Sequence, residues 1–107
     1  MTSVKELTMK IPRQVRVGKR VYKVVEPLHT GAKLGVGRID YEKRVISVAT
    51  RSPITGRRLR KKDRTRIFWH EIVHAVLMDM GSRKSSDEGF VEAFAIRLTD
   101  VVTSARF

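Results

Sequence analysis

The sequence IFWHEIVHAVLMDM at residues 67–80 is the most informative stretch of this chain. Its apolar residues recur every three or four positions, which places them on one face of an α-helix. These residues are Ile67, Phe68, Ile72, Val73, Ala75, Val76 and Met80. The pattern predicts a helix from about Arg60 to Met80, and Gly81 is a typical helix terminator.

A second helical pattern follows a short polar connection at residues 82–86. It predicts a helix from about Asp87 to Ser104. The apolar face of this helix would carry Phe90, Val91, Phe94, Ala95, Leu98, Val101 and Val102. Because the connection is so short, we expect the two helices to run antiparallel.

Upstream of the helices, apolar residues alternate with polar ones, as they do in β-strands. Residues 15–25 surround Gly18 and predict a hairpin, while residues 34–39 and 44–49 predict two further strands. Residues 51–56 contain proline and glycine and predict a loop. Strands followed by helices indicate an α+β domain, in which a small antiparallel or mixed sheet of about four strands packs against two C-terminal helices.

The chain has 107 residues, and we expect a single domain over residues 1–107. No apolar run approaches the roughly 18 residues of a membrane span, and the N-terminus lacks the apolar stretch of a secretory signal. There is no cysteine, which excludes disulfides and thiolate metal ligands. We therefore expect a cytoplasmic protein that has no membrane partner.

The chain is strongly basic, with 23 Lys and Arg against 11 Asp and Glu. Residues 51–66 alone hold eight basic residues and one acidic residue, Asp63. Such an excess of positive charge attracts DNA, RNA or an acidic partner without reading base sequence. The candidate nucleic-acid-binding residues are Arg57, Arg58, Arg60, Lys61 and Lys62.

The predicted first helix contains the motif His70-Glu71-Ile72-Val73-His74. Two histidines four residues apart lie on one helix face, so both imidazoles can reach one cation. Glu71 lies beside them, where a carboxylate can accept a proton from an attacking water. Imidazole ligands with one open position suit zinc, and we expect one Zn²⁺ per chain.

The third zinc ligand is expected from the second helix, where Glu88 and Glu92 lie four residues apart. If Ser85 caps that helix, Glu92 lies roughly 10 Å along it, the same distance that separates His74 from the end of the first helix. Glu88 lies only about 4.5 Å along it and completes a capping-box pattern that begins at Ser85. We therefore predict Glu92 as the third ligand, with Glu88 as the alternative ligand or as a residue that orients one.

The HExxH motif followed by a helical glutamate resembles the zincin metallopeptidases of the gluzincin type. The resemblance is to the short phage and bacterial proteins with a minimal zincin domain, and it covers nearly the whole chain. The matching elements are Ile11-Pro12, the basic hairpin at 15–25, Gly37-Arg38-Ile39-Asp40, the strand at 45–48, His70 to His74, and Phe90-Val91-Glu92-Ala93.

This resemblance implies a phage-encoded zinc endopeptidase that acts on a polypeptide in the host bacterial cytoplasm, near nucleic acid. His70, His74 and Glu92 would bind the zinc, and Glu71 would act as general base and then as general acid. An extended substrate would pair with an edge strand of the sheet, for which residues 44–49 are the candidate.

Larger gluzincins stabilise the oxyanion with a Tyr or His from a downstream subdomain. Tyr41, His29 and Arg97 are the candidates for that role in this chain. His29 also fits the ordinary pattern of a solvated loop histidine, and Trp69 and Phe68 fit core positions.

A second class of function is a basic nucleic-acid-associated binding protein whose zinc site is structural or vestigial. Glu71 favours the peptidase over this alternative, because a structural zinc needs no base and uses a closed set of ligands.

Overall fold

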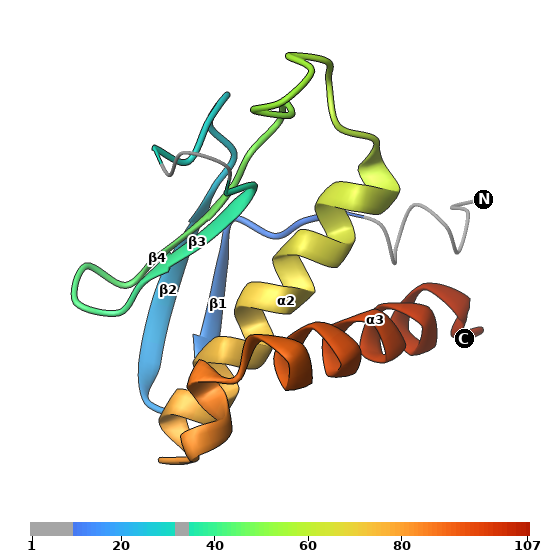
Figure 1. The fold of residues 1–107 in the computed structure, drawn as a ribbon. Coiled ribbons are helices and arrows are strands. Elements are labelled where there is room, and N and C mark those ends of the chain that lie inside the picture. Colours follow the sequence, from blue (N-terminus) through green and yellow to red (C-terminus); the bar gives the residue numbers. More distant parts are fainter. Residues whose placement is uncertain (1–9, 32–34) are drawn as a thin grey trace.

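The structure is a computed structural model that describes residues 10–31 and 35–107 (Figure 1). It contains the strands β1 (Gln14–Val17), β2 (Arg20–Val25), β3 (Gly37–Asp40) and β4 (Val45–Val48), and then the helices α2 (Lys61–Asp79), η1 (Arg83–Ser86, a 3₁₀ helix) and α3 (Glu88–Ser104). The predicted α+β fold is confirmed: a mixed four-stranded sheet packs against two C-terminal helices. Leu34, where the third strand was predicted to begin, lies outside the described residues.

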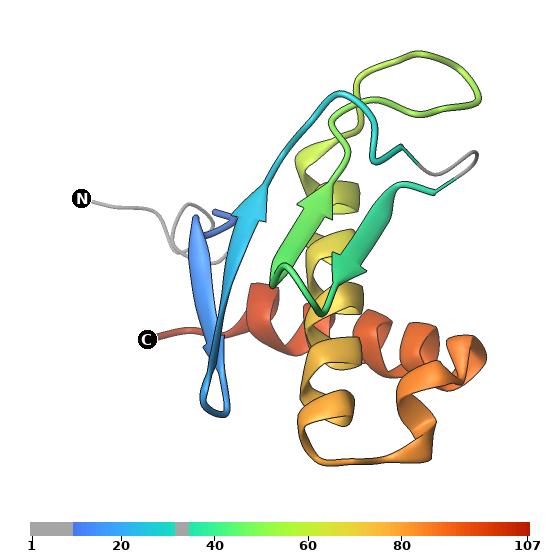
Figure 2. The same ribbon diagram turned by 90° about the vertical axis from the view of Figure 1, so that its left-hand side faces the viewer.

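The strands follow the order β1-β2-β4-β3 across the sheet. β1 and β2 form an antiparallel hairpin that turns at Gly18, whose φ of +61° favours glycine. β3 and β4 form a second antiparallel hairpin, and β4 pairs in parallel with β2. β1 and β3 are therefore the edge strands, which Figure 2 shows on either side of the sheet.

The prediction that residues 44–49 form the edge strand is wrong, because β4 has a hydrogen-bonded neighbour on both sides. The reason lies in the residues of the two strands. Ile46 and Val48 of β4 are fully buried, whereas β3 carries the charged residues Arg38 and Asp40. Charges are tolerated at an edge, so the more apolar strand takes the interior position.

The main core lies between the inner face of the sheet and α2. Alternate strand residues point inward, as the register shows by placing Val24 beside Ile46 and Ile46 beside Ile39. The buried members of this core are Val17, Tyr22, Val24, Ile46, Val48, Ile67, Phe68, Ile72 and Ala75. Phe68 is therefore a core residue as predicted, and Trp69 packs against the same cluster.

α3 packs on α2 and not on the sheet, so the sheet, α2 and α3 form successive layers (Figure 1). A small second core of Val73, Val91 and Ala95 joins the two helices. Gly81, with φ of +70°, reverses the chain after α2, and this brings the start of α3 beside the middle of α2. No helix within the described part of the chain is long and apolar enough to cross a membrane.

Candidate metal centre

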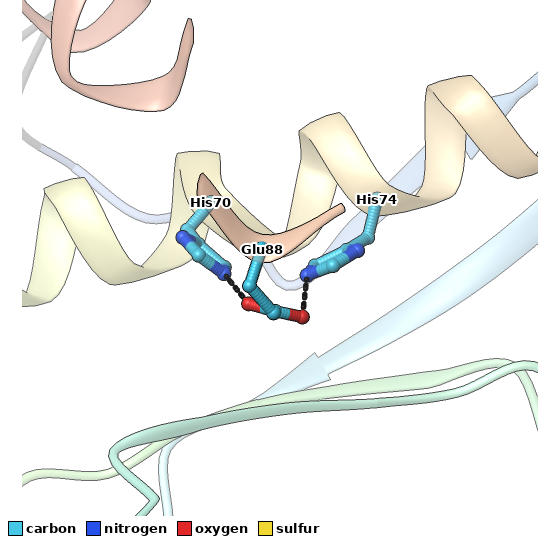
Figure 3. A group of neighbouring side chains, drawn as sticks. All are labelled: His70, His74 and Glu88. Carbon is cyan, nitrogen blue, oxygen red and sulfur yellow. Dashed lines mark hydrogen bonds and ion pairs between the residues drawn. The ribbon is translucent and has the colours of Figure 1, made fainter. Parts of the chain in front are cut away.

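His70 and His74 lie one turn apart on the face of α2 that meets the start of α3 (Figure 3). Their ring centroids are 4.9 Å apart, as the spacing of four residues predicts. His74 is buried and His70 is partly buried, so neither imidazole is a freely solvated surface group.

The carboxylate of Glu88 bridges the two histidines (Figure 3). Its Oε2 atom lies 3.2 Å from Nε2 of His70, and its Oε1 atom lies 3.0 Å from Nε2 of His74. One ligand atom from each of these three residues lies within 4.8 Å of the other two. Zinc binds imidazole nitrogen and carboxylate oxygen at roughly 2.0–2.2 Å, so this donor set fits a single zinc ion in both chemistry and size.

The other nitrogen of each imidazole is held by a hydrogen-bond acceptor. Nδ1 of His74 donates to the carbonyl oxygen of Ser85 over 2.6 Å, because a carbonyl can only accept. Nδ1 of His70 lies 3.1 Å from Oε2 of Glu92. A proton on each Nδ1 leaves the lone pair of Nε2 free for a metal, and such partners fix the ring orientation of metal-binding histidines.

The two glutamates exchange the positions that the sequence predicts. Glu88 lies between the two Nε2 atoms, while Glu92 contacts the far side of the His70 ring. The predicted capping box that begins at Ser85 is wrong, because Asp87 caps α3 and accepts a hydrogen bond from the Phe90 backbone N–H over 3.0 Å.

The cap of α3 lies two residues after Ser85, because Ser82 begins an extra turn. Its side chain accepts from the Lys84 N–H over 3.1 Å and caps the 3₁₀ helix η1, which contains Ser85. α3 then begins at Glu88, and its first residue, not its fifth, faces the two Nε2 atoms.

Glu71 follows His70 on α2, and its side chain is buried, with only 6% exposed. Burial raises the pKa of Glu71 to about 7; His70 lowers it, whereas Glu88 and Glu92 raise it further. The carboxylate lies against the edge strand, because a Cβ atom built on Gly37 would be 2.6 Å from its Oε2.

A hollow of about 260 Å³ opens beside this carboxylate. Its walls come from residues 35–37 of the sheet edge, from Arg66, Ile67, His70 and Glu71 of α2, and from Glu92 of α3. His70 and Glu71 thus share one recess with residues at the start of the edge strand β3, which is an arrangement that suits an extended ligand.

The three candidates for oxyanion stabilisation lie in different surroundings. Burial raises the pKa of Tyr41, and the negative charges of Glu71, Tyr22 and Glu88 raise it further, in that order. Tyr41 therefore lies within electrostatic reach of the site. His29 is an exposed loop residue, and Arg97 donates to the Ala93 carbonyl of its own helix over 2.9 Å.

Sequence reasoning missed three contributors to the site: Gly37, Arg66 and the Ser85 carbonyl. For Gly37 a signal was available, since an isolated glycine in a strand often marks a close approach to the backbone. Backbone carbonyls carry no such signal, because every residue has one.

Comparison with known proteins gave no relative: no protein-family model matches the chain, and neither a curated protein nor a solved structure matches it. The function must therefore be argued from the site itself.

Proposed function

We propose that this protein is a zinc-dependent peptidase of the zincin type, in which His70, His74 and Glu88 hold the metal. One observation carries the proposal: the Glu88 carboxylate lies within 3.2 Å of both Nε2 atoms, next to the buried carboxylate of Glu71. A merely structural zinc would have no use for a buried base beside an open recess.

Zinc bound to these three residues would supply a Lewis acid that makes water a nucleophile near neutral pH. The chain's own contribution is Glu71. A carboxylate with a pKa of about 7 can take up a proton at neutral pH and release it again, as a general base that turns into a general acid must do. The low exposure of Glu71 supports this role, because burial is what tunes its pKa.

In this proposal the peptide substrate binds along the edge strand β3. This strand is an edge of the sheet, and the residues at its start line the hollow that contains Glu71. The free N–H and C=O groups of an edge strand pair readily with an extended peptide. A peptide paired there would run past Glu71 and His70, which line the same hollow.

Two measurements on the purified protein test this function. Elemental analysis should find about one zinc ion per chain. Unfolded protein substrates should be cleaved, and Glu71→Gln should lower the rate by roughly 10²–10⁴ while zinc content stays the same. Equal rates for the two proteins, or a protein that takes up no metal, would refute the proposal.

A second candidate function, binding to nucleic acid, is supported by the segment that precedes the site. Arg57, Arg58, Arg60, Lys61 and Lys62 are all exposed, in the loop before α2 and in its first turn. Among the described residues, only Arg60 of these five forms an ion pair, with Asp63 at 3.0 Å. The others are available to phosphate groups.

A further inference from the structure

We propose that Arg66 makes this site select substrates with an acidic side chain just after the bond that is cleaved. The inference rests on the proposed peptidase function and adds the chemical class of the substrate to it. It comes from the position of one guanidinium in the wall of the hollow.

Arg66 lies one turn before His70 on α2 and lines the hollow together with Glu71. Its side chain is exposed, and it forms no hydrogen bond or ion pair with any other described residue. Arg64 differs, since its Nη1 atom lies 3.1 Å from Oε1 of Glu26. The recess that a substrate must enter therefore presents an unpaired positive charge.

The charge around the recess favours a carboxylate as its partner. Lys62 lies one further turn along α2, so basic residues continue from Arg66 toward the start of the helix. Glu92 also lines the hollow, but its carboxylate is engaged by Nδ1 of His70 at 3.1 Å. A guanidinium binds a carboxylate through two parallel N–H donors, a geometry that an amide or an ammonium group cannot match.

The direction of β3 determines on which side of the cleaved bond this contact falls. Both ribbon views show β3 and α2 running in the same general direction (Figures 1 and 2). Gly37 is level with Ile67 and Glu71, so Arg66 lies toward residues 35 and 36, before the strand begins.

We take the bound peptide to pair antiparallel to β3, as β4 does on the other side of this strand, so that it meets these elements in reverse order. Its chain passes Asp40 first, then Gly37 and the Glu71 carboxylate, and only afterwards residue 35 and Arg66. The bond that is attacked lies beside Glu71. The residues that contact Arg66 are therefore those on the C-terminal side of that bond.

A set of short peptides with an N-terminal hydroxamate group tests this inference by binding alone. The hydroxamate anchors on zinc, and the first two residues after it carry Glu, Gln or Lys in turn. Calorimetric titration of the zinc-loaded protein should show roughly tenfold tighter binding for Glu than for Gln at one of the two positions, because a hydrogen bond between two charged groups is stronger than one that involves a neutral amide.

Arg66→Ala should reduce that preference to less than about twofold, whereas Arg66→Lys should retain part of it. Arg20→Ala is the matched control, since Arg20 is an exposed arginine of β2 that does not line the hollow, and it should leave the preference unchanged. Equal binding of the Glu and Gln peptides, or a preference that survives Arg66→Ala, would overturn the inference alone. If no hydroxamate binds at all, the zinc site fails and the inference fails with it.

Discussion

A Cβ atom built on Gly37 would lie 2.6 Å from Oε2 of Glu71, so the backbone of the edge strand directly covers the carboxylate that we propose as the base. The same Cβ atom would lie 2.6 Å from Cγ2 of Ile67, one turn earlier on α2. Both neighbours are buried and have little room to move. The absence of a side chain at position 37 therefore sets how closely β3 approaches the helix that carries the site.

Gly37→Ala should consequently damage both stability and activity. The added methyl group must displace Glu71 or push β3 away from α2, and such overpacking costs about 1–3 kcal/mol. Denaturant unfolding should show this loss of free energy, and peptide cleavage should fall further than the loss of folded protein explains. Gly89→Ala is a suitable control, because its Cβ atom would meet only ordinary contact with Asp87 at 3.6 Å.

The sequence predicted the bounds of the two helices well, but it did not predict which residue caps the N-terminus of α3. The apolar spacing of residues 67–80 is regular, and it produced bounds close to those of α2. The start of α3 was harder, since Ser82, Ser85 and Asp87 are all good N-cap residues. The choice among them depends on how the chain leaves α2, and local sequence does not contain that information.

Strand order was the second point that the sequence could not supply. The hairpins follow from local turns, whereas the parallel pairing of β2 with β4 joins residues separated by more than twenty positions. Alternation of apolar residues shows which face of a strand is buried but not which neighbour it has. The identity of the edge strand, and with it the edge that we propose for substrate binding, therefore required the structure.

Substitution of the two glutamates of α3 should affect zinc binding unequally. Glu88→Gln removes the carboxylate that contacts both Nε2 atoms, so zinc affinity should fall by more than the 10–100-fold typical of residues that only orient a ligand. Glu92→Gln should lower zinc affinity by no more than about 10–100-fold, because Glu92 contacts Nδ1 of His70 and so only orients that ligand. Competition with a zinc-binding dye measures both affinities. The reverse order would make Glu92 the third ligand, as the sequence predicted.

The metal-free protein should become less stable as the pH rises from about 4.5 to about 7. The pKa of Glu71 is about 7 in the folded protein against 4.5 for an ordinary glutamate, so in this range the folded state keeps a proton that the unfolded chain has lost. The contribution of the Glu71 carboxyl group to the free energy of unfolding is therefore fully present below pH 4.5. It is lost as the pH rises through the folded-state pKa of about 7. The complete shift corresponds to about 3 kcal/mol at most.

Glu71→Gln isolates this contribution, because it removes the Glu71 carboxyl group and leaves the side chains of His70 and His74 in place. Urea unfolding in the presence of a chelator, at pH 5 and at pH 8, should give a larger fall in unfolding free energy for the natural protein than for the variant. Equal falls would mean that Glu71 is ionised in the folded state throughout this range.

Binding to DNA or RNA, if the basic segment is responsible for it, should depend steeply on salt and little on base sequence, because phosphate contacts release counterions. Replacing Arg57, Arg58, Arg60, Lys61 and Lys62 by Ala should remove most of the affinity and flatten the salt dependence.

The matched control removes five exposed charges from the β1–β2 hairpin instead: Arg13, Arg16, Lys19, Arg20 and Lys23. Both variants have the same net charge, so fluorescence anisotropy with a labelled duplex at several salt concentrations distinguishes a local surface from the general charge of the protein. Equal losses in the two variants would show that the overall charge, and not the segment before α2, attracts nucleic acid.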